Sequence, residues 1–160
     1  MRAFKHIPPK DEAELAKIFP NYRDFAWQDD GSMIQLPISI WDKWVNDITE
    51  DVDAMLWECS DEESLERELK FCNLAVEIVT QFDVYGYFHN QDKLKKVRSK
   101  EQLISDIVKS KELERALFIP CQEAIYFQSH DYTAWLYLSN QDKGKVLKGL
   151  VEQCGLKFIK

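Results

Sequence analysis

The chain has 160 residues, of which 45% are apolar and 12% aromatic, and its formal net charge is −7. This length and composition favour a single folded domain over residues 1–160 and argue against a disordered chain. The negative charge argues against non-specific binding to nucleic acid or to an anionic membrane surface, and it favours a basic partner.

The cysteines and the N-terminus bear on compartment and cofactors. The four cysteines, at positions 59, 72, 121 and 154, form no CxxC pair and no zinc-type spacing with histidine. The first residues lack the apolar core of a signal peptide, and no apolar run is long enough to cross a bilayer. We therefore expect free thiols in a cytoplasmic protein that uses no cofactor and no metal.

The first half of the chain is predicted to be mainly helical. A short helix is expected before Pro20. Residues 25–36 alternate around a DDGS turn, which indicates a β-hairpin. Over residues 40–56, apolar side chains recur at spacings of three and four, which predicts one long helix with Ser39 as its N-cap.

A second long helix is expected to begin at Ser60. Ser60 and Glu63 have the spacing of a capping box, and the later turns are apolar almost all round. The C-terminal half of this helix should therefore lie in the centre of the fold. A short strand at 84–88 and a helix at 100–109, capped by Ser99, are expected to follow.

The last third carries the clearest strand pattern. RALFIP, EAIYFQ and YTAWLYLS are short runs rich in aromatic and β-branched residues, and the turns between them are so brief that neighbouring strands must be antiparallel. A helix, KVLKGLVEQC, and a closing strand, LKFI, complete the chain. We therefore predict an α+β fold in which a helical N-terminal half packs on a small antiparallel sheet in the C-terminal third, with the order β-β-β-α-β.

The main functional feature is the placement of charge. Between residues 42 and 68 there are eleven carboxylates and only two cations, Lys43 and Arg67, so this stretch carries −9 and the rest of the chain +2. Like charges this crowded destabilise a fold unless something compensates them, and a basic partner is one such compensation. A solvated helix hairpin is the alternative interpretation. The residues predicted to contact a partner are Glu50, Asp51, Asp53, Glu58, Asp61, Glu62, Glu63 and Glu66.

Two other functions stay open at this stage. His130 and Asp131 are adjacent, as in some acid–base pairs, so a small-molecule-binding or enzymatic domain could have a cleft near them and Trp135. However, no nucleophile motif accompanies them, and a turn between strands is the simpler interpretation of Asp131. An adaptor that exposes Trp135 and Tyr137 on a sheet face is the third hypothesis. We identify no catalytic residue and expect no enzyme.

The last third also carries a family resemblance. The segment FIPCQEAIYFQSHDYTAWLYL, followed by a helix and a closing CGLKFI, resembles the small acidic immunity proteins of bacterial contact-dependent and other polymorphic toxin systems. The resemblance implies a cytoplasmic protein without catalysis that binds and neutralises a cognate toxin domain. Such toxin domains are commonly basic, which agrees with the acidic stretch, and no role is carried over to an individual residue.

Overall fold

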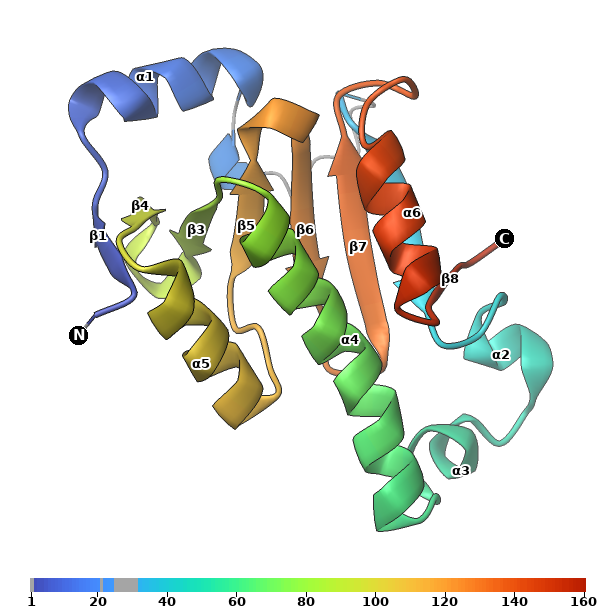
Figure 1. Cartoon of the computed structure of the whole chain (residues 1–160). Helices are drawn as coiled ribbons and strands as arrows, with labels where there is room; N and C mark the ends of the chain where they lie inside the picture. Colours follow the sequence, from blue (N-terminus) through green and yellow to red (C-terminus); the bar gives the residue numbers. More distant parts are fainter. Residues whose placement is uncertain (1, 21, 25–31) are drawn as a thin grey trace.

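One antiparallel sheet organises the whole chain. The computed structural model describes residues 2–20, 22–24 and 32–160, and its eight strands follow the order β1-β4-β3-β5-β6-β7-β2-β8 (Figure 1). The strands are β1 (Phe4–His6), β2 (Ile34–Ser39), β3 (Tyr85–Phe88), β4 (Lys93–Val97), β5 (Ala116–Ile119), β6 (Ala124–Gln128), β7 (Thr133–Leu138) and β8 (Lys157–Phe158).

Helices connect the strands and cover the sheet. They are α1 (Pro9–Ile18), α2 (Val45–Ile48), α3 (Val52–Trp57), α4 (Asp61–Gln81), α5 (Lys100–Ser110) and α6 (Lys145–Gln153), with short 3₁₀ turns η1 (Tyr22–Asp24), η2 (His89–Gln91) and η3 (Pro120–Gln122). Helices α4, α5 and α6 lie over one face of the sheet (Figure 1). Helix α1 lies at one end of the molecule, and α2 and α3 lie at the opposite end.

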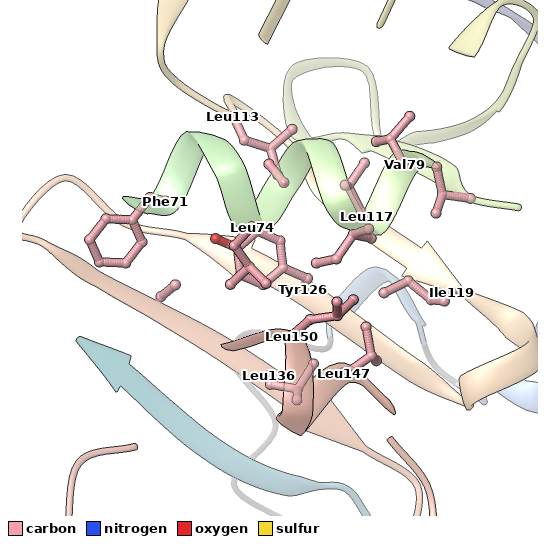
Figure 2. Close-up of a cluster of buried hydrophobic side chains, with 14 of the residues drawn as sticks. Phe71, Leu74, Val79, Leu113, Leu117, Ile119, Tyr126, Leu136, Leu147 and Leu150 are labelled. Atoms are coloured by element: carbon pink, nitrogen blue, oxygen red, sulfur yellow. The ribbon is translucent and has the colours of Figure 1, made fainter. Parts of the chain in front are cut away.

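The larger core lies between the sheet and helices α4, α5 and α6. Phe71 and Leu74 of α4 point toward sheet side chains that include Leu117, Tyr126 and Leu136 (Figure 2). All five side chains are at most 2% exposed. A second, smaller core on the other sheet face is made by α1, η1 and the aromatic residues of β3, β5 and β7. Burial on both faces explains why the central strands are apolar along their whole length.

Several predicted elements are confirmed. Ser60 caps α4 by accepting a hydrogen bond from the Glu63 backbone N–H at 3.1 Å, and Ser99 caps α5 in the same way through Gln102. The three C-terminal runs form β5, β6 and β7, which pair antiparallel. The C-terminal half of α4 is buried, as its apolar pattern indicates.

The predicted fold class is wrong in its architecture. The fold is α+β, but its eight-stranded sheet draws strands from the whole chain and does not sit behind a helical N-terminal half. Strand β1 has only three residues, and β4, KLKKV, holds three lysines and two apolar residues without regular alternation, so neither has a strong strand pattern. Strand β1 forms one edge of the sheet and β4 is its neighbour, and lysines near a sheet edge oppose edge-to-edge aggregation.

The helix predicted over residues 40–56 is also wrong. Ser39, the expected N-cap, is buried at the end of β2, and its Oγ donates to the Tyr132 carbonyl at 2.7 Å. The expected N-cap is therefore the last residue of a strand that pairs with β7. The rest divides into α2 and α3, because Thr49 is extended and Asp51 caps α3 by accepting from the Ala54 N–H. The predicted hairpin over 25–36 lies largely outside the described residues, and its described end, β2, pairs with β7 and β8.

Candidate functional site

The acidic stretch forms one end of the molecule. Helices α2 and α3 and the first turns of α4 gather there, beyond the edge of the sheet (Figure 1). We call residues 42–68 the acidic end. Side-chain caps begin two of its helices: Asp51 caps α3 and Ser60 caps α4. The carboxylates Asp61, Glu62 and Glu63 occupy the first turn of α4, where the helix dipole stabilises negative charge.

Arg67 fastens α3 to α4. Its Nη1 donates to the carbonyl of Met55 at 3.1 Å and to that of Leu56 at 3.4 Å, so it satisfies acceptors at the C-terminal end of α3. Its Nη2 pairs with Glu63 Oε1 at 2.6 Å. The Arg67 side chain is only 13% exposed, so this cation serves the fold and leaves the outer carboxylates uncompensated.

An aromatic cluster holds the same arginine against the sheet. The guanidinium carbon of Arg67 lies 5.3 Å from the ring centre of Trp41 and 5.4 Å from that of Tyr132, within range of a cation–π interaction. Tyr132 also contacts Trp57, with ring centres 5.8 Å apart, and its hydroxyl lies 3.2 Å from Ser64 Oγ. The β6–β7 turn thereby positions the acidic end relative to the sheet.

The predicted contact residues are brought together and stay exposed. Among the described residues, the only ion pair that any of the eight carboxylates makes is that of Glu63 with Arg67. Glu62 and Glu66 stand one helical turn apart, where like charges repel each other. All eight side chains are exposed: Glu50, Asp51, Asp53, Glu58, Asp61, Glu62, Glu63 and Glu66.

Exposed apolar side chains accompany these charges. Of the seven large apolar side chains that are exposed in the described part of the chain, five lie between residues 44 and 69. They are Trp44, Ile48, Trp57, Leu65 and Leu69. Trp57, at 54%, is the most exposed of the seven. Trp44 is 37% exposed, and its ring centre lies 5.9 Å from that of Trp135. Large aromatic side chains next to charge are typical of protein interfaces.

A cavity of about 220 Å³ adjoins the acidic end, beneath the N-terminal half of α4. Trp57 and Tyr132 contribute aromatic walls, and the carboxylates of Glu68, Glu112 and Glu114 also line it, against one cation, Lys111. Gln128 lines the cavity too, and its Oε1 is buried with no hydrogen-bond partner among the described residues. A cavity with this lining suits an inserted lysine or arginine side chain, because a cation supplies the donors that these oxygens lack.

The alternative site at His130 is only partly assembled. His130 lines this cavity but is exposed, and Asp131 and Trp135 do not line it. Asp131 lies in the β6–β7 turn, as expected, whereas Trp135 packs on the opposite sheet face. Tyr137 is 5% exposed, so it and Trp135 do not form the exposed pair that the adaptor hypothesis needs.

Comparison with known proteins adds no further constraint. No protein-family model matches the chain, and neither a curated protein nor a solved structure matches it. In the described ranges, no helix has the length and apolar character needed to cross a membrane, and no three His, Cys, Asp or Glu side chains are grouped so that they could hold a metal ion.

Sequence reasoning identified the carboxylates and missed what surrounds them. The structural role of Arg67 depends on its contact with Met55 and Leu56, residues that the predicted long helix would have placed elsewhere. The exposure of Trp57 was not predicted either. The cavity joins α4 to the α5–β5 loop and the β6–β7 turn, which are far apart in the sequence.

Proposed function

We propose that this chain is a binding protein whose acidic end covers a basic domain of another protein, and that it acts as an immunity protein that neutralises a toxin in this way. The observation that carries the proposal is the coincidence of exposed carboxylates and exposed large apolar side chains on one end of the molecule. The resemblance of the C-terminal third to immunity proteins supports the same function.

Each part of the acidic end has a distinct role in this proposal. The unpaired carboxylates attract a cationic domain over a distance and raise the association rate. Trp57 and Leu65 then supply the apolar contact area that keeps the complex together. The cavity beside Glu68 accepts one lysine or arginine of the partner. Binding blocks the partner's active surface without chemistry in this chain.

The test uses the product of the gene next to the one that encodes this chain. That product should be basic, should arrest growth when expressed alone, and should be harmless when this chain is co-expressed. Replacing Asp53, Glu58 and Glu62 by lysine should abolish the protection, because the surface charge then repels the toxin. The matched control replaces the exposed residues Glu101, Asp142 and Glu152, outside the acidic end, and should keep it.

Two results contradict the proposal. A neighbouring product that is acidic or without toxicity removes the immunity function. Protection that is equally strong with the acidic-end variant and with the control variant removes the acidic end as the binding surface. The amount of each variant in the cell must be equal to that of the wild type, so that a folding defect is recognised as such.

A further inference from the structure

A second cavity lies at the opposite edge of the sheet, where the charge is reversed. It has a volume of about 640 Å³ and is formed by β1, the ends of β3 and β4, α5 and the residue before β5. In a chain with a net charge of −7, its lining holds five permanent cations and one carboxylate. The cations are Arg2, Lys5, Lys95, Arg98 and Arg115, and the carboxylate is Asp106. We call this cavity the basic cleft.

Two phenylalanine rings form one wall of the basic cleft and contact two of its five cations. Phe4 and Phe88 meet edge to face, with ring centres 5.1 Å apart. The guanidinium of Arg115 lies 5.0 Å from the first ring and 4.5 Å from the second, and Lys95 Nζ lies 4.3 Å from the second. Gly86 makes this arrangement possible, because a Cβ there would come within 2.6 Å of the Phe4 ring.

These cations have almost no internal counter-ions. Among the described residues, Lys95 and Arg98 have no carboxylate within 4.0 Å, and Arg115 reaches only the exposed Glu114, at 3.9 Å. Asp106 is already an acceptor for the Gln102 amide. The Arg115 side chain is 25% exposed, and its burial lowers its pKa from the usual value, although it stays charged at neutral pH. The Arg115 guanidinium is thus partly desolvated and only weakly compensated by an exposed carboxylate, which suits it to binding an external anion.

We propose that the basic cleft binds a small organic phosphate that carries at least two phosphoryl charges. Several cations converge on one cavity, so a singly charged ligand would leave most of them uncompensated. The planar fork of an arginine matches a phosphate with two parallel hydrogen bonds. The phenylalanine wall gives the organic part of the ligand an apolar surface. This site is independent of the acidic end, which lies on the other side of the molecule (Figure 1).

Calorimetric titration of the full chain with tripolyphosphate and with ATP tests the proposal. Both probes should bind with one-to-one stoichiometry at low salt and more weakly as salt rises. Lys95→Met and Arg115→Met should each weaken binding about tenfold or more, since each removes a charge-assisted contact. Lys109→Met, on the exposed side of α5, is the matched control and should bind as the wild type does. Arg98→Gln, an exposed position, serves as a further variant if Arg115→Met does not fold.

The outcomes separate the sources of the phosphate. Equal binding of both probes assigns the cleft to the phosphate chain alone, and tighter binding of ATP assigns a contact to the phenylalanine wall. The protein could also sediment with phosphatidylinositol phosphate vesicles. If it does, and if Lys95→Met abolishes this sedimentation, the phosphate belongs to a lipid headgroup. The proposal is overturned if neither probe binds at low salt, if citrate binds more tightly than tripolyphosphate, or if Lys109→Met weakens binding as much as Lys95→Met does.

Discussion

Replacing Arg67 by methionine tests how the acidic end is held in place. The change removes two hydrogen bonds to the carbonyls of Met55 and Leu56, the ion pair with Glu63 and two cation–π contacts, while the apolar part of the side chain is kept. The hydrogen bond at 3.1 Å from a charged donor contributes about 1.5–3 kcal/mol, and the longer one less. The partly exposed ion pair contributes below about 1 kcal/mol, and the ring contacts about 0.5–1 kcal/mol each.

Because these contributions share one side chain, they do not add fully, and we expect a loss of about 2–4 kcal/mol in the free energy of unfolding. That is a large fraction of the stability of an ordinary domain. The assays are urea denaturation and amide hydrogen exchange. Relative to the wild type, the exchange rate should rise more in α3 than in the central strands. Arg67→Lys should be intermediate, since an ammonium keeps the charge and loses the fork. A loss below about 0.5 kcal/mol with unchanged exchange in α3 would refute this role for Arg67.

Three further predictions concern the fold. Tyr126→Phe should raise the free energy of unfolding by up to about 1–2 kcal/mol in urea denaturation, because the buried hydroxyl has no partner among the described residues; a loss would reveal one. Gly144→Ala should lower the free energy of unfolding by about 1–2 kcal/mol or more, since φ is +70° and a Cβ there would clash with a core leucine. Gly149 has open space around it, so Gly149→Ala should stabilise α6. The Ser139 hydroxyl lowers the pKa of Glu123 below its usual 4.5. Glu123→Gln should therefore lower the melting temperature at pH 7, and this difference from the wild type should disappear as pH falls below 4.5. An equal difference in melting temperature at pH 3 would contradict the prediction.

The elements that could be predicted from sequence are those with local determinants. Ser60 and Ser99 cap their helices through backbone N–H groups three residues away, and the pattern of α4 is long enough to identify its buried half. The strands β5 to β7 are joined by short turns, so their antiparallel pairing follows from chain connectivity alone.

The elements that could not be predicted depend on distant partners. Strand β2 pairs with β7, about a hundred positions along the chain, and that pairing makes Ser39 the last residue of a strand where the local pattern favours a helix N-cap. The same limit applies to the sites. The carboxylates of the acidic end are contiguous in the sequence and were found, whereas the cations of the basic cleft come from three separate segments and were not.

The two charged surfaces give the molecule a polarity that its net charge conceals. The acidic end lies beside one edge of the sheet and the basic cleft beside the other (Figure 1). A cationic partner would therefore approach in a preferred orientation, with the basic cleft turned away from it. An occupied basic cleft would leave the acidic end free.

The association rate of this chain with the purified product of the neighbouring gene tests the central claim most directly. The wild type, the variant with lysine at Asp53, Glu58 and Glu62, and the control variant with lysine at Glu101, Asp142 and Glu152 are compared at low and at physiological salt. We predict that the acidic-end variant associates about tenfold or more slowly than the control variant, and that the wild-type rate falls steeply with salt. Equal rates for the two variants, or a wild-type rate that does not depend on salt, would contradict the account.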